Sequence, residues 1–330
     1  MMVRGGLIVV LAAGLAACSG PQSVLAPHGP QAQSLAWLIW TIVAVCCVVW
    51  ALVIVALAAA LVRPQRRRKG DSAAQRRLSI VVGTATAGTV IVIAAFTFIS
   101  FRATASLQPA GPYPVTIHVR AYQWWWEVTY PDAEDGGSFV TANEIHVPVG
   151  EPVRVQLSAA DVIHSFWIPS LAGKQDLIPG RTTEIVVSAS SPGVYRGQCA
   201  EFCGFQHAHM ALSVVADEKD AFEAWKASQR QSAAAPDNDD TRDGERVFTR
   251  GACAGCHTIR GTAAVGRTGP DLTHVGSRRT IGAGLFETTQ GSLAAWIADP
   301  QALKPGNTMP QVSLSPAELK ALAAYMASLK

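Results

Sequence analysis

One short segment of the sequence, Cys199–Met210, is dense in side chains that bind soft metal ions. It holds two thiols, two imidazoles, a carboxylate and a thioether: Cys199, Cys203, His207, His209, Glu201 and Met210. Thiolates exclude the hard cations that prefer oxygen, and zinc would leave the thioether without a role, so copper is favoured. A disulfide between the cysteines would leave His207 without a partner. A mononuclear electron-transfer site needs one cysteine, so the second thiol predicts a binuclear copper centre.

A second pair of cysteines has the spacing of a c-type haem attachment site. In Cys253-Ala254-Gly255-Cys256-His257, the two thiols can form thioethers to one porphyrin, and His257 is the proximal iron ligand. A zinc or disulfide pair is the alternative, but it leaves His257 unexplained. Met309 is the best sixth ligand, because Met326 falls on the apolar stripe of the last predicted helix. Histidine and methionine together fill both axial positions, which predicts an electron carrier.

Two kinds of soluble domain must position these groups. Between residues 108 and 226, apolar residues alternate with polar ones in short runs at 115–119, 153–157 and 185–187, separated by Pro–Gly turns. This period of two predicts an antiparallel β-sandwich or barrel. Residues 227–241 are small and polar, as in a linker, and residues 242–330 are expected to form a small all-α domain. Its last helix has Ser315 as N-cap and Glu318 completing a capping box, and His274 is expected at the surface.

The N-terminal third has the composition of a membrane anchor. The chain is 49% apolar and only 15% charged, and residues 34–62 and 78–101 carry no charge, so both are long enough to span a bilayer. The loop 63–77 holds seven Lys/Arg against one acid, Asp71, which predicts that it is cytoplasmic and that both soluble domains lie outside. This position disfavours a nucleic-acid role for the loop. Residues 1–17 read as a secretory signal, and Leu15-Ala16-Ala17-Cys18 resembles a bacterial lipobox, which makes Cys18 a candidate lipid anchor.

The copper segment resembles the CuA loop of cytochrome c oxidase subunit II, through its Cys-x3-Cys-x3-His-x2-Met spacing. Residues 161–167 resemble the segment that carries the family's first histidine. The resemblance implies a cupredoxin-like domain in which Cys199 and Cys203 bridge two coppers. The implied remaining ligands are His164, His207, the weak ligand Met210 and the main-chain carbonyl of Glu201. The Glu201 side chain would also contribute to a magnesium site shared with the catalytic subunit.

Two further segments resemble parts of electron-transfer families. Gln123–Trp126 is similar to the aromatic run through which subunit II accepts electrons from cytochrome c, with Trp124 as the accepting residue. Residues 242–330 resemble class I cytochrome c, through the Cys253–His257 motif, the segment 268–272 and the segment 305–310 that carries Met309.

Together these resemblances imply subunit II of a bacterial haem-copper cytochrome c oxidase, a proton-translocating respiratory complex, with a fused cytochrome c. The chain would accept electrons through covalent haem c and CuA and pass them to the catalytic subunit I, which reduces oxygen, so no catalytic residue is assigned here. Further oxidase subunits, a cytochrome c or a quinol:cytochrome c reductase donor, and the inner membrane with periplasmic soluble domains are implied. A nitric oxide reductase subunit and a stand-alone membrane-tethered carrier are the alternatives. Residues 78–101 lack the glutamate that family members place near the start of the second span.

The two soluble domains carry opposite charge. Residues 102–236 hold nine Lys/Arg against fourteen Asp/Glu, a net of −5, whereas residues 242–330 hold ten against six, a net of +4. Complementary charge steers association, and a tether raises the effective concentration of the attached domain. We therefore expect the haem domain to dock on its own copper domain.

Overall fold

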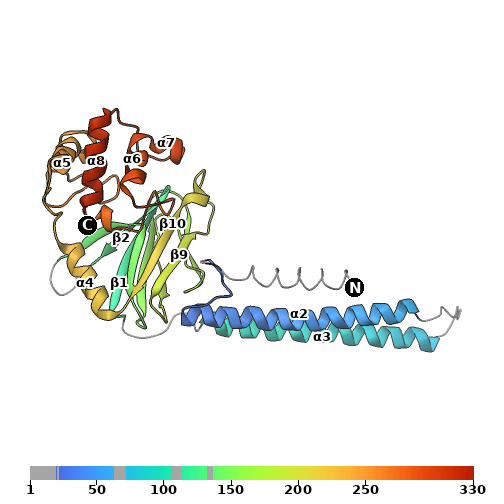
Figure 1. The fold of residues 1–330 in the computed structure, drawn as a ribbon. Coiled ribbons are helices and arrows are strands. Elements are labelled where there is room, and N and C mark those ends of the chain that lie inside the picture. The colour runs from blue at the N-terminus through green and yellow to red at the C-terminus, as the bar shows by residue number, and fades with distance from the viewer. Residues whose placement is uncertain (1–19, 21, 63–71, 106–112, 132–136) are drawn as a thin grey trace, which may run out of the picture. The chain divides into compact units, whose positions relative to one another are not determined.

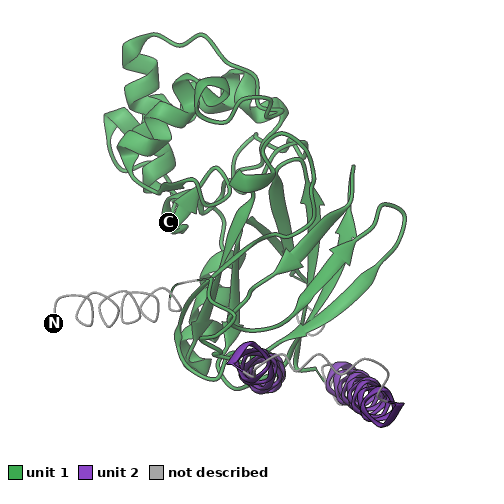
Figure 2. Ribbon diagram, turned by 90° about the vertical axis from the view of Figure 1, so that its right-hand side faces the viewer, with its two compact units in different colours: residues 1–32, 111–330 green, residues 33–110 purple. Residues whose placement is uncertain are grey.

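The computed structural model of the 330-residue chain describes residues 20, 22–62, 72–105, 113–131 and 137–330 (Figure 1). The predicted signal segment 1–17, Cys18 and most of the predicted cytoplasmic loop lie outside the described residues. The chain divides into two compact units, residues 33–110 and residues 1–32 with 111–330, so that both soluble domains belong to one unit (Figure 2).

Two long helices hold the apolar residues predicted to span the membrane. Helix α2 covers Pro30–Val62 and helix α3 covers Ser72–Ala105, and each is long and apolar enough to cross a bilayer. Most of their large apolar side chains are exposed, as expected of surfaces that lipid would cover. Both helices start before the predicted spans, and α3 takes in residues 72–77 of the predicted loop, where Ala, Gln and Arg are good helix formers.

The middle of the chain folds into two packed five-stranded sheets, as predicted. One sheet has the strand order β3-β2-β1-β5-β8 and the other β4-β10-β9-β6-β7. Most neighbours are antiparallel, but β1 pairs with β5 and β4 with β10 in parallel. The first sheet is formed by β1 (Val115–Tyr122), β2 (Trp125–Tyr130), β3 (Phe139–Ala142), β5 (Val153–Ala159) and β8 (Thr183–Val187). The second is formed by β4 (Glu144–Pro148), β6 (His164–Trp167), β7 (Lys174–Leu177), β9 (Gly193–Cys199) and β10 (Ala211–Asp217).

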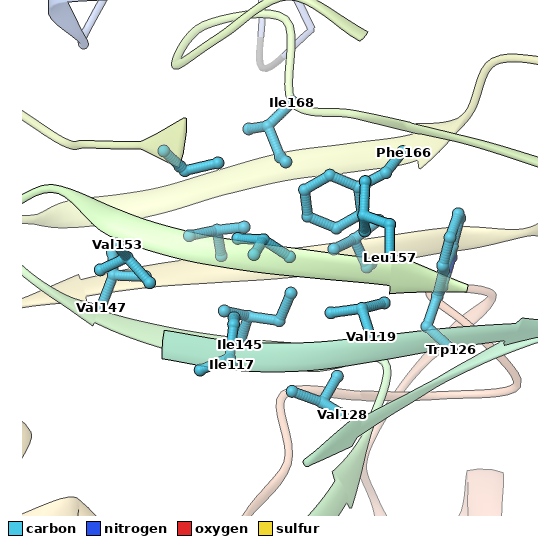
Figure 3. Packing of buried hydrophobic residues seen from close by; sticks show 14 of the residues in the cluster. Ile117, Val119, Trp126, Val128, Ile145, Val147, Val153, Leu157, Phe166 and Ile168 are labelled. Carbon is cyan, nitrogen blue, oxygen red and sulfur yellow. The ribbon is translucent and has the colours of Figure 1, made fainter. Parts of the chain in front are cut away.

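The alternating residues supply the core between the sheets. Ile117 and Val119 on β1 and Val153 and Leu157 on β5 point toward side chains of the opposite sheet (Figure 3). At one end of this core, the Trp126 ring meets the Phe166 ring edge-on, with 5.8 Å between centroids. Each such buried side chain stabilises the fold by about 1.5–3 kcal/mol. This rigid frame carries the loop 200–210 between β9 and β10, called the copper loop below because it holds predicted copper ligands.

The C-terminal domain is helical, as predicted, with α5 (Asp239–Arg250), α6 (Gln290–Ala298), α7 (Pro300–Leu303) and α8 (Pro316–Ser328). A short hairpin of β11 (Thr280–Ile281) and β12 (Phe286–Glu287) lies between η3 (Val275–Ser277) and α6. Helices α5 and α8 cross closely at Gly244, where a Cβ atom would lie 2.2 Å from the Ala321 carbonyl oxygen. The predicted capping box is present, because Ser315 and Glu318 satisfy each other's backbone N–H groups.

The connection between the soluble domains is shorter than the predicted linker 227–241. Helix α4 (Lys219–Arg230) continues to residue 230, and α5 begins at Asp239 behind the N-cap residue Asn238. The helix α4 is held to the sandwich because the Trp225 ring stacks on His146, with 4.0 Å between ring centroids. Composition alone does not reveal such a contact.

Candidate functional site

The structure brings all six predicted copper ligands to one end of the sandwich. His164 begins β6, Cys199 ends β9, and the loop between β9 and β10 carries the other four. The Cys199 and Cys203 sulfurs lie 3.7 Å apart, too far for a disulfide. Cys203 Sγ lies 3.6 Å from His207 Nδ1 and 3.8 Å from Met210 Sδ. Cys199 Sγ lies 3.9 Å from His164 Nδ1 and 3.2 Å from the Glu201 carbonyl oxygen.

The electrostatics of the two thiols favour a bound cation. A hydrogen bond from the Cys203 thiol lowers the pKa of Cys199 to about 4, while that shared bond and burial raise the pKa of Cys203. Two adjacent buried thiolates repel each other, so both can ionise only when a cation lies between them. Soft donors that converge in this way fit copper.

Asp161 orients His164, the first predicted copper histidine, and also holds the turn that carries Trp124. Its Oδ1 lies 2.8 Å from His164 Nε2, which leaves Nδ1 facing the thiols. Its carboxylate also accepts hydrogen bonds from the backbone N–H groups of Gln123 and Val162, each at 2.7 Å. Burial lowers the pKa of His164, but the bonds to Cys199 and Asp161 outweigh burial and raise it overall. Such outer partners fix the orientation of metal-binding imidazoles.

Two other polar side chains of the loop face away from the sulfurs. The Glu201 carboxylate is 45% exposed and lies 3.9 Å from Lys174 Nζ, while the Glu201 carbonyl oxygen faces Cys199. His209, which did not fit the ligand spacing, pairs through Nδ1 with Gln206 Oε1 at 2.7 Å.

The helical domain contains an apolar cavity of about 230 Å³ lined by the predicted haem residues. Cys253, Cys256, His257 and Met309 all line it, and both thiols are free. His257 Nδ1 donates to the Pro270 carbonyl oxygen at 2.8 Å, which leaves Nε2 as the nitrogen able to bind iron. Burial lowers the pKa of His257, so the ring is neutral, as an iron ligand must be. The His257 ring packs tightly against Gly269, because a Cβ atom at residue 269 would lie 2.5 Å from the ring. These residues fit a covalent haem.

Trp124 connects the two candidate centres. Its indole N–H donates to the Cys203 carbonyl oxygen at 3.0 Å, and its ring lines the cavity that holds the haem residues. Trp124 is 8% exposed, and Gly306 of the helical domain lies beside its ring. Trp126 is buried in the sandwich core, and the half-buried Trp125 stacks on Tyr122.

The two soluble domains touch through hydrogen bonds to backbone groups, and the donors include the Lys304 amino group. The Ala211 N–H donates to the Ala283 carbonyl oxygen at 3.0 Å, and the Gln206 amide donates to the Pro305 carbonyl oxygen at 2.7 Å. One carboxylate takes part, because Glu144 accepts from the Arg279 backbone N–H at 2.9 Å. The domains are therefore docked as expected, but the contacts are short hydrogen bonds rather than paired charges.

Sequence reasoning missed three residues of this region and misplaced a fourth. Asp161 and Gln123 lie in the segments 161–167 and 123–126 that resemble the family, but no spacing rule identifies a residue that orients a metal ligand. Lys304 has no sequence signal other than a basic side chain before Pro305-Gly306. His274, expected at the surface, is buried, because its ring nitrogens pair with the carbonyl oxygens of Lys330 and Gln231. The chain terminus and the linker thus close over it.

Comparisons with known proteins agree with the division of the soluble part into a β-sandwich domain and a helical domain. Residues 115–217 match the family described as cytochrome c oxidase subunit II, periplasmic domain, and residues 241–330 match cytochrome c. Cytochrome c oxidase subunit 2 of Alkalihalophilus pseudofirmus is 35% identical over 332 residues, with 96% of this chain and 94% of that protein covered. The Bacillus subtilis protein is 33% identical over 227 residues, covering 66% of this chain and 62% of its own length. The solved periplasmic domain of subunit II (CoxB) of Bradyrhizobium japonicum is 34% identical, with a TM-score of 0.35, over 37% of this chain and 97% of that one.

Proposed function

The chain belongs to the cytochrome c oxidase subunit II family, and from this premise we propose that it relays electrons from an external donor to the catalytic subunit of a respiratory oxidase. The observation that carries the proposal is the position of Trp124, which donates a hydrogen bond to the Cys203 carbonyl oxygen and also lines the cavity of the helical domain. One side chain thus links the two predicted redox sites.

The two sites would hold different groups. Cys253 and Cys256 would attach the haem covalently, with His257 and Met309 as axial ligands. The two coppers would be held by His164, Cys199, Glu201, Cys203, His207 and Met210. When bound, these groups supply one-electron carriers with every axial or ligand position filled by protein.

The protein's own residues keep the two sites close and dry. Trp124 is almost fully buried, so water is excluded from the space between the copper loop and the haem cavity. Gln123 Nε2 donates to the same Cys203 carbonyl oxygen at 2.7 Å, which fixes the turn carrying Trp124 against the copper loop. A rigid, water-free contact of this kind lowers the reorganisation that electron transfer requires.

The surroundings of the chain follow from the same proposal. Helices α2 and α3 would anchor it in the inner membrane with the soluble domains in the periplasm, and Cys18 would carry a lipid. The exposed Glu201 carboxylate would face subunit I, where a shared magnesium ion would bind. The donor would be a cytochrome c or a quinol:cytochrome c reductase complex.

Purification of the tagged full chain from bacterial membranes tests the proposal. We expect a large haem-copper subunit to co-purify and the preparation to consume oxygen with reduced cytochrome c. Trp124→Leu should slow oxygen consumption, whereas the matched control Trp225→Leu, at a ring that stacks on His146 away from the cavity, should change it much less. Nitric oxide consumption without oxygen consumption, or a chain that purifies alone and still carries electrons, would contradict the proposal.

A further inference from the structure

A single lysine is buried where the two soluble domains meet. Lys304 follows α7 in the helical domain, five positions before Met309, and its side chain is enclosed so that the residue is 3% exposed. Lysine is almost never fully buried unless its charge is compensated. Burial lowers the pKa of Lys304 to about 7, which reflects how completely the amino group is removed from water.

Three carbonyl oxygens surround the Lys304 amino group. They belong to Trp124 at 2.9 Å, His209 at 2.8 Å and Gly282 at 2.9 Å. Below its lowered pKa of about 7 the group is an ammonium with three N–H donors, and each donor then has one acceptor. The first two acceptors come from the copper domain and the third from the hairpin β11–β12 of the helical domain.

Two of the three acceptors lie beside parts of the proposed electron route. The Trp124 carbonyl belongs to the residue that bonds to Cys203, and His209 directly precedes the copper ligand Met210. The segment that begins at Lys304 leads through Gly306, which lies beside the Trp124 ring, to Met309. One ammonium group therefore fixes the sixth-ligand segment, the tryptophan turn and the copper loop together.

We propose that Lys304 is the positioning residue that locks the haem domain onto Trp124. The role rests on the proposed function, but the lock itself is a structural property of this chain. Because the acceptors are uncharged carbonyls, the lock does not depend on the opposite net charges of the two domains. It also keeps Trp124 covered, so that an external donor must deliver electrons to the helical domain rather than to Trp124.

Lys304→Met removes all three donors and keeps an unbranched side chain that is one atom shorter. The three carbonyl oxygens then stay buried without this donor. Removing one partner of a buried hydrogen bond costs more free energy than removing both partners. We expect the amide of Ala211, which bonds across the interface, to exchange with solvent about tenfold faster or more in the purified full chain. Electron transfer from haem to copper after rapid photoreduction should slow by a similar factor.

The matched control is Lys320→Met, which removes an exposed lysine of α8 that pairs with Asp240 away from the interface. It should leave both rates unchanged. Lys304→Gln is the second variant, because its amide has two donors and should give an intermediate exchange rate. It decides the question if Lys304→Met fails to fold, as judged by loss of the haem spectrum.

Unchanged Ala211 exchange in Lys304→Met, or in Lys304→Gln where that variant decides, would overturn the proposal. So would exchange in the unmodified chain that accelerates steeply with salt, because a lock of neutral acceptors should be insensitive to ionic strength. Amide exchange does not require electron transfer, so a chain that fails to pass electrons can still show the lock. Failure of the proposed function is thereby distinguished from failure of this inference.

Discussion

Replacement of Asp161 by asparagine should weaken copper binding although Asp161 is not itself a predicted ligand. The carboxylate accepts from the Gln123 and Val162 backbone N–H groups and pairs with His164 Nε2. An asparagine has one oxygen, so its NH₂ group must face at least one of these donors. The loop then loses a hydrogen bond to a charged group, which is worth about 1.5–3 kcal/mol.

The expected effect on copper can be stated from the geometry. His164 loses the partner that leaves Nδ1 free for the metal, and loss of such an outer partner costs about 10–100-fold in metal affinity. This corresponds to about 1.4–2.8 kcal/mol, which agrees with the cost of the hydrogen bond. Because the Asp161 side chain is 31% exposed, water should replace part of the loss, and the lower half of the range is expected.

Competition of the full chain against a copper chelator measures this affinity, and the haem spectrum serves as an internal control for folding. Asp217→Asn is the matched control, because Asp217 also pairs with a histidine, His146, at 2.6 Å but away from the copper loop. It should leave copper affinity unchanged. Equal copper affinity in Asp161→Asn and the unmodified chain would refute the reasoning.

Two further predictions concern the helical domain. Gly244→Ala should destabilise it by about 1–3 kcal/mol, because the new Cβ would meet the Ala321 carbonyl oxygen and force α5 and α8 apart. Gly291→Ala should be tolerated in thermal unfolding, because its Cβ would meet only Thr289 Oγ1, at an ordinary contact distance of 3.8 Å. Ser315→Ala should cost about 1 kcal/mol through the lost N-cap, measured by denaturant unfolding. Hydrogen bonds from Ser315 lower the pKa of the Glu318 carboxylate. The contribution of this carboxylate to helix stability should therefore be complete above pH 4.5 and be lost as the pH falls below it. Protection of the amides at the start of α8, relative to their intrinsic exchange rate at each pH, that does not decrease in acid would contradict the last expectation.

The parts of the molecule that could be predicted from the sequence are those governed by local patterns. Alternation at 115–119 predicted β1, and Ser315 and Glu318 predicted the start of α8. The family resemblance of two short segments predicted which side chains gather around the two thiols. The remaining features depend on contacts between distant segments. Lys304 meets Trp124 across 180 positions, and His274 is covered by the chain terminus, so neither burial has a local signal.

The docking of the two soluble domains shows the same limit. Opposite net charges predicted that the domains would associate, but a sum of charges carries no information about which groups touch. In the structure the contacts converge on Lys304 and on the loop at Ala283, whose backbone has a positive φ of 64°. This loop presents its carbonyl oxygen to Ala211, immediately after the predicted copper ligand Met210. Geometry of this kind arises only when the whole fold is assembled.

Metal analysis of the purified full chain, combined with optical spectra before and after acid extraction of haem, tests the central claim most directly. The account predicts two copper ions for each haem iron, and haem that stays attached to the protein through Cys253 and Cys256. Zinc in place of copper, a single copper per haem, or haem that is removed by extraction would contradict it.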